Sequence, residues 1–297
     1  MIWILVALLS ALFTSFRHVY IKKYCSEVPS EILIFSTRLF GTLLYLPFLI
    51  GRPVAIQPVH LFWSVLGLTV IVTALATIVQ IRVIQKHDIS ISVPYLSFIP
   101  LLMIPWSALL LKESPPPAAW LGLVFGSAGA WMIQQTGQPV QLNLKQLTSN
   151  VGLLMFGVAV ALGLTTTCDK LAINASSAMV YAGLWTLVST VVMFLFSLRH
   201  PFSLIKSALV SRHVLIQSVF WAGAFGCQML GVQLVTVSSG VVYVKMLTML
   251  HILFSVGFGG FYFKESYFLK RLIAAGLMMA GAGLTIWASY GLSGAGN

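Results

Sequence analysis

Several polar side chains stand inside long apolar segments, where they could bind a charged solute. Lys245 is the clearest of them, and three polar residues share its helix face of about 120° at 100° per residue: Thr248, His251 and Ser255. A charge at the centre of a bilayer costs about 2.5–3.5 kcal/mol, so it needs a partner, a water-filled cavity or a route to the surface. We expect Lys245, with Tyr243, to bind substrate; the alternative is that the lysine extends to the surface. His251 could carry a proton, and its alternative role is structural.

Arg17 and Asp169 carry opposite charges and lie 152 residues apart, which is the spacing of the repeat described below. If their helices approach one another, the two side chains could close one end of a pathway as an ion pair that opens during transport. The alternative is that both residues mark the ends of helices, because Lys22, Lys23 and Asn174 follow within two turns.

Two other segments carry polar stripes. The first stripe covers about 80° of helix surface: Thr69, Thr73, Thr77 and Gln80. The second covers about 40°: Gln217, Trp221 and Gln228. Glutamines are costly to bury in lipid and Trp221 offers an aromatic wall, so we expect the second stripe to line a cavity. For the threonines, packing between helices is an equal alternative.

A further segment contains Pro94, Pro100 and Pro105, with Tyr95 and Ser97 between them. Each proline frees a backbone carbonyl that lipid cannot satisfy, so a broken helix is tolerated only where protein or cavity water covers it. We expect this segment to face inward as a hinge or a wall of the site.

The composition defines the elements that must position these residues. Of the 297 residues, 59% are hydrophobic and 8% are charged, with a mean hydropathy of +0.96, whereas soluble proteins average about 25% charged residues. Uninterrupted apolar runs of about 20 residues predict an all-α integral membrane protein, because barrel strands would alternate. We expect ten transmembrane helices: 2–21, 31–50, 60–81, 90–111, 117–135, 150–171, 177–198, 213–235, 239–263 and 268–290.

Several classes of function are excluded. The formal charge of +11 comes from basic residues at the ends of spans, so we expect no nucleic-acid partner. The three cysteines lack metal-ligand spacing, and the chain carries no hydrolase or metalloprotease motif, so we expect no cofactor and no enzyme activity.

The chain contains a repeat. Lys-Glu-Ser occurs at 112–114 and again at 264–266, and each copy is followed by small residues on one spacing: Gly122, Gly126 and Gly129, then Gly276, Ala280 and Gly283. We expect five-helix repeats at 1–136 and 150–297, joined by a loop at 137–149. Since five is odd, the second copy enters from the opposite side, which makes two inverted repeats. Glu113 and Glu265 are expected to accept bonds from the start of the next helix, and the small residues to form packing or dimer faces.

The basic residues also predict an orientation. Twelve lie between odd- and even-numbered spans and three lie on the opposite side: Arg52, Lys112 and Lys170. The positive-inside rule then places the twelve in the cytoplasm and both termini outside; a miscounted span is the alternative.

In these features the chain resembles the drug/metabolite transporter superfamily, in particular its ten-span EamA-type branch. The resemblance rests on Pro100, on Glu113 13 residues later and on the glycine-rich span that follows. The second half repeats Glu265 and its small residues but has Ile252 in place of the proline. The resemblance implies transport of small organic molecules without ATP, and both termini in the cytoplasm, against the charge count.

We therefore expect a secondary-active transporter that works by alternating access, with one repeat rocking against the other around a cavity at mid-membrane. Arg17, Arg38 and Lys245 outnumber Asp169 within the spans, which favours an anionic or zwitterionic solute such as an amino acid or organic acid. The alternatives are a lipid or lipid-linked-sugar translocase and a multidrug exporter. We expect small-molecule substrate and membrane lipid as partners, a possible homodimer, and a bacterial inner membrane as the location.

Overall fold

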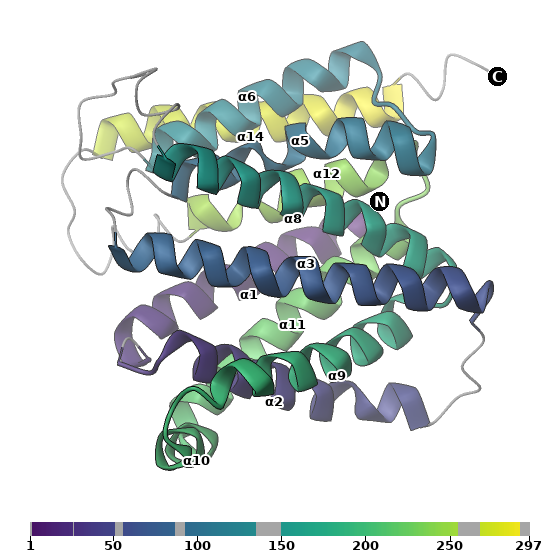
Figure 1. Ribbon diagram of the computed structural model, residues 1–297. Coiled ribbons are helices and arrows are strands. Elements are labelled where there is room, and N and C mark those ends of the chain that lie inside the picture. Colours follow the sequence, from purple (N-terminus) through teal and green to yellow (C-terminus); the bar gives the residue numbers. More distant parts are fainter. Residues whose placement is uncertain are drawn as a thin grey trace. The chain divides into compact units, whose positions relative to one another are not determined.

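The computed structural model describes residues 2–25, 27–50, 56–86, 93–134, 150–254 and 268–291, and every element within them is a helix (Figure 1). Helical architecture follows from the apolar runs, because a helix satisfies all its backbone hydrogen bonds within the segment. The predicted loop 137–149 and the residues Ser255 and Glu265 lie outside these ranges.

Five of the described helices are long and apolar enough to cross a membrane. These are α2 (Ser30–Ile50), α3 (Val59–Lys86), α8 (Asn150–Asn174), α9 (Ala178–Ser197) and α11 (Arg212–Leu234). The others are α1 (Ile2–Tyr24), α6 (Pro117–Gln134), α10 (Phe202–Val210), α12 (Gly240–Thr248) and α14 (Phe268–Gly291). Thus five of the ten predicted spans have the length and the hydropathy to cross a membrane, and the count of ten stays a prediction.

The proline-containing segment is broken, as the sequence predicts. It consists of a 3-10 helix, η1 (Val93–Phe98), a short α-helix, α5 (Ile99–Trp106), and a π-helical turn, η2 (Ser107–Leu111). Pro100 is the second residue of α5, and Pro105 lies inside the helix. A proline cannot donate to the preceding turn, so hydrogen bonding shifts register there.

The chain divides into two compact units, and each takes segments from both predicted repeats. Unit 1 comprises Met1–Ile78 and Cys168–Leu234; unit 2 comprises Val79–Thr167 and Val235–Asn297. A compact unit need not coincide with a sequence repeat. This division therefore does not test the predicted repeats, and their boundaries stay a prediction.

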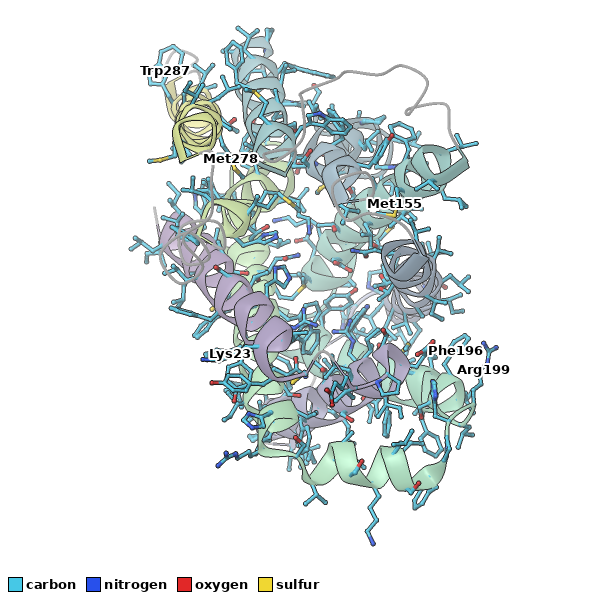
Figure 2. All side chains as sticks on the ribbon, turned by 90° about the vertical axis from the view of Figure 1, so that its left-hand side faces the viewer. Lys23, Met155, Phe196, Arg199, Met278 and Trp287 are labelled. Atoms are coloured by element: carbon cyan, nitrogen blue, oxygen red, sulfur yellow. The ribbon has the colours of Figure 1, made fainter. Side chains whose placement is uncertain are left out.

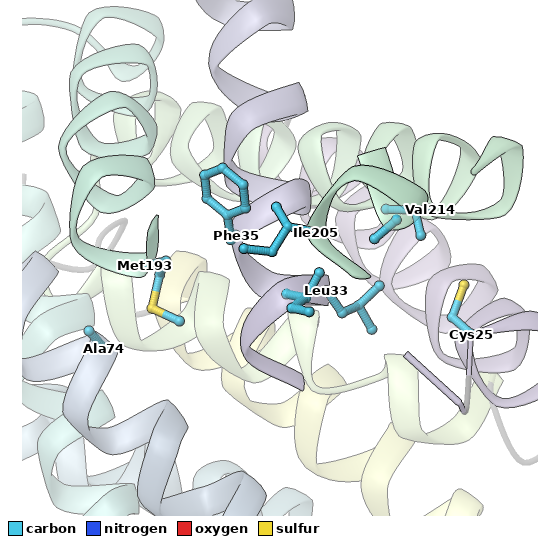
Figure 3. Close-up of a cluster of buried hydrophobic side chains, with 9 residues drawn as sticks. Cys25, Leu33, Phe35, Ala74, Met193, Ile205 and Val214 are labelled. Atoms are coloured by element: carbon cyan, nitrogen blue, oxygen red, sulfur yellow. The ribbon is translucent and has the colours of Figure 1, made fainter. Parts of the chain in front are cut away.

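In unit 1, α2 packs on α9 and α1 packs on α11. Both pairs are antiparallel: in the first, Glu31 contacts His200 at one end, and Leu49 lies beside Gly183 at the other. The apolar core at one end of the unit gathers side chains from several helices around Leu33 and Phe35 (Figure 3).

In unit 2, α6 packs on α14 through glycines. A Cβ atom on Gly281 would lie 2.3 Å from the backbone nitrogen of Gly126 and 2.6 Å from the carbonyl oxygen of Gly122. On α14, Met278 is buried and Trp287 is exposed (Figure 2). The glycines predicted on α6 therefore form a packing face with α14, since only glycine allows backbones this close. The small residues predicted on α14 do not share this face: Gly276, Ala280 and Gly283 are exposed, and Gly281 makes the contact instead.

We predict that Gly281→Ala lowers the free energy of unfolding by about 1–3 kcal/mol, because the added methyl group meets backbone atoms that cannot turn aside. Gly283→Ala is the matched control, because a Cβ atom there meets nothing within 4 Å. Thermal unfolding of the two purified variants in detergent checks this, and equal melting temperatures would contradict it.

Candidate functional site

The Arg38 side chain lies between two indole rings in unit 1. Its guanidinium carbon is 4.0 Å from the ring centre of Trp221 on α11 and 4.6 Å from that of Trp185 on α9. The cation is attracted to both ring faces, and the two rings hold the guanidinium plane in place. Arg38 thus has a fixed orientation in the middle of α2.

Two hydrogen-bond donors of the Arg38 guanidinium have no acceptor within the described residues. The Nε and Nη1 atoms of Arg38 are enclosed, and neither has a hydrogen-bond partner within the described residues. The side chain as a whole is half-buried. A buried charged donor without an acceptor is costly, so an anion that reached the guanidinium would relieve that cost.

The aromatic walls depend on close helix packing. Phe225 lies 5.0 Å from the ring centres of both Trp185 and Trp221, so the three rings form one cluster. Opposite them, Gly41 makes room for the indole: a Cβ atom there would lie 2.8 Å from Trp221 Cζ3. The glycine therefore sets how near Trp221 comes to α2.

A second arginine joins the cluster through a glutamine. Arg17 Nε on α1 donates to Gln217 Oε1 at 3.4 Å, and Gln217 Nε2 donates to Thr37 Oγ1 at 2.6 Å. Gln217 is fully buried and lies one helical turn before Trp221 on α11, and Thr37 directly precedes Arg38 on α2. Within the described residues neither guanidinium has a carboxylate partner. The cluster can therefore hold an anion, with Gln217 orienting Arg17.

Asp169 makes a different set of contacts. Its carboxylate accepts a hydrogen bond from the Tyr181 hydroxyl, which lies 3.0 Å from Thr69 Oγ1, so α8, α9 and α3 are linked within unit 1. Arg17 bonds to Gln217 instead. The ion pair between Arg17 and Asp169 stays a prediction.

The predicted substrate-binding residues fall in both units. Those in unit 1 are Gln217 and Trp221, which lie at the cluster, and Gln228, Thr73 and Thr77, which are half-buried elsewhere on α11 and α3. Those in unit 2 are Gln80, Tyr95, Ser97, Tyr243, Lys245, Thr248 and His251. Of these, Tyr95, Ser97, Tyr243 and Thr248 are buried, and the other three are half-buried.

Two polar side chains at and just beyond the end of α12 lie against nearby backbone carbonyls. Thr248 Oγ1 donates to the Lys245 carbonyl at 2.8 Å, and His251 Nδ1 lies 2.8 Å from the Thr248 carbonyl. Because a carbonyl only accepts, that ring nitrogen carries the hydrogen. Both roles given for His251, proton carrier and structural residue, stay predictions.

Glu113 accepts a hydrogen bond at a helix start, as expected, but from a different helix. Its Oε2 atom accepts the backbone N–H of Ser239 at 2.7 Å, and Ser239 precedes the first residue of α12. The expected donor was the following helix, α6. A carboxylate is favoured at α12 because the helix N-terminus is positive.

Two residues of the cluster were not predicted as site residues. Arg38 stands in the middle of an apolar span, and an ionisable residue there is itself a signal of function. Trp185 carries no such signal, because tryptophan is common in apolar helices and only the packing of α9 on α2 brings it to Arg38.

The described helices define a multi-pass helical membrane protein. The profile of the EamA-like transporter family matches residues 1–134. The first half of the chain is therefore similar to this family, which agrees with the resemblance noted from the sequence.

No curated protein matches the chain. Solved structures do match, in 28 chains. One of them, titled "Crystal structure of protein", is similar to this chain with a TM-score of 0.76 and 16% sequence identity. The match covers 96% of this chain and 97% of that chain. At this identity the likeness shows the fold alone.

We predict that Gln217→Leu lowers the free energy of unfolding by about 1–3 kcal/mol, because it leaves the Arg17 guanidinium without its acceptor. Gln228→Leu, on the same helix but only half-buried, should change it by less than about 0.5 kcal/mol. Melting temperatures of both variants in detergent test this. Equal losses would mean that the Arg17 contact contributes nothing.

Proposed function

We propose that the chain is a secondary-active transporter of a small anionic or zwitterionic organic solute, such as an amino acid or organic acid, and that Arg38 binds the anionic group. The observation that carries this proposal is the Arg38 guanidinium, which is held between Trp185 and Trp221 with unsatisfied donors. A carboxylate or phosphate bound to the guanidinium would supply a missing acceptor.

The balance of charge in the spans supports an anionic solute. Arg17 and Arg38 form one positive cluster, and Lys245 adds a third cation on α12. The acidic side chain, Asp169, already accepts the hydroxyl of Tyr181. A carrier of organic cations needs the reverse arrangement, with a carboxylate facing the solute.

Alternating access on a ten-span inverted repeat is part of the proposal. In an inverted repeat, a helix on the pseudo-twofold axis packs antiparallel on its own equivalent. The second helices of the two halves, α2 and α9, pack this way, and Thr42 Oγ1 lies 3.1 Å from Thr190 Oγ1 at their crossing. The fifth helices, α6 and α14, cross where Gly126 meets Gly281. These contacts support two equivalent halves that exchange roles during transport.

A ligand screen with three forms of the protein tests the substrate class. We expect amino acids, organic acids or sugar phosphates, rather than cationic drugs, to raise the melting temperature of the wild type. Arg38→Met should abolish that rise, and Arg38→Lys should keep part of it, because lysine retains the charge but loses the planar contact with the indoles. A cationic drug that stabilises wild type and Arg38→Met equally would overturn the proposal.

The ligand-free melting temperatures give an internal control. Arg38→Met loses the cation–π contacts, worth up to about 2 kcal/mol, but it also removes an unsatisfied buried charge that costs several kcal/mol. We therefore expect the variant to be at least as stable as the wild type, so a lost ligand response cannot be attributed to unfolding. A large fall in its melting temperature would show that Arg38 stabilises the fold.

Lys245 is proposed as a second substrate contact. Lys245→Ala should reduce uptake or exchange in proteoliposomes at least tenfold while the protein remains folded in detergent. Lys112→Ala, an exposed lysine of the same unit, is the control. Unchanged uptake kinetics for Lys245→Ala would remove Lys245 from the site.

A further inference from the structure

α10 is a short helix that joins α9 to α11 at one end of unit 1. At nine residues it is too short to cross a membrane. Its buried residues, Ile205 and Ala208, belong to the same apolar cluster as Leu33 and Val214, so the helix is anchored on α2 and α11 (Figure 3).

The outer face of α10 is also apolar. Phe202 is 70% exposed, Val210 is 78% exposed and Leu204 is 44% exposed, and Lys206 lies exposed among them. A helix that is anchored on one side and presents aromatic, aliphatic and basic side chains on the other has the composition of a helix at a membrane interface. In that position the apolar side chains reach the acyl chains and the lysine stays among the headgroups.

Basic residues gather at this end of unit 1. Arg199, at the end of α9, places its guanidinium 5.4 Å from the ring centre of Phe196 (Figure 2), and Arg212 begins α11; both are exposed. Two acidic residues lie on the neighbouring segment: Glu27 is exposed, and Glu31 contacts His200 at 3.4 Å. Lys23, at the end of α1, is exposed at the same end, where its neighbour Tyr24 stacks on His213. With Lys206, four exposed cations therefore lie near one exposed carboxylate in this part of the described chain.

We propose that α10 lies in the membrane interface and that Arg199, Lys206 and Arg212 bind the phosphates of anionic phospholipids. Each lysine or arginine near an anionic surface strengthens binding by about fivefold, and the short spacing of these three allows them to act together. The same charges place this end of unit 1 on the cytoplasmic side. The site is separate from Arg38 and does not depend on which solute is carried.

Thermal unfolding of the full chain in a neutral detergent tests the proposal. Added phosphatidylglycerol should raise the melting temperature by several degrees more than phosphatidylcholine, and this difference should fall as salt is added. Glycerol 3-phosphate alone should have no such effect, because it lacks the acyl chains that α10 contacts. Equal shifts from both lipids, or a difference that salt leaves unchanged, would overturn the proposal.

Variants that remove the basic charges test whether these three residues cause the difference between the two lipids. Replacing Arg199, Lys206 and Arg212 together by Gln should remove most of the difference between the two lipids, and Lys206→Gln alone should reduce it. Lys112→Gln, the matched exposed lysine in unit 2, should leave it unchanged. A triple variant that keeps the full difference would refute the site. If the triple variant fails to fold, the comparison of Lys206→Gln with Lys112→Gln decides.

Discussion

The contact on which the site depends is the stacking of the Arg38 guanidinium between Trp185 and Trp221. An arginine in the middle of a membrane span is tolerated only if its charge is screened, and here two ring faces do so without supplying an acceptor. The cation keeps its charge while its hydrogen-bonding capacity remains unused. In the proposed function, an anionic solute would supply the acceptor that these donors lack, and this would be the physical basis of selective binding.

The packing around Arg38 keeps that cation from finding another partner. Gly41 admits Trp221, the antiparallel α2 and α9 bring Trp185 alongside, and Gln217 occupies Arg17. These contacts fix the positions of the two indole rings and of the Arg17 guanidinium. The unit gives up some stability to hold two positive charges close together, as functional sites commonly do.

Much of the architecture could be predicted from the sequence, because it depends on local properties. Apolar runs predict helices, the prolines predict the break around α5, and the glycine spacing predicts the close packing of α6. The site was predicted only in part: Gln217 and Trp221 stand out on one helix face, but Trp185 joins them only through the pairing of α9 with α2. That pairing links residues far apart in the chain, and periodicity carries no information about it. The short helix α10 was not predicted, because nine residues are too few for a span and only its packing on α2 and α11 shows which side is buried.

A structure of the protein with its transported solute bound tests the central claim most directly. The account predicts a carboxylate or phosphate oxygen of the solute within hydrogen-bonding distance of the Arg38 guanidinium, with Trp185 and Trp221 still stacked on it. A solute whose charged group lies elsewhere, with Arg38 unchanged and unpartnered, would contradict it.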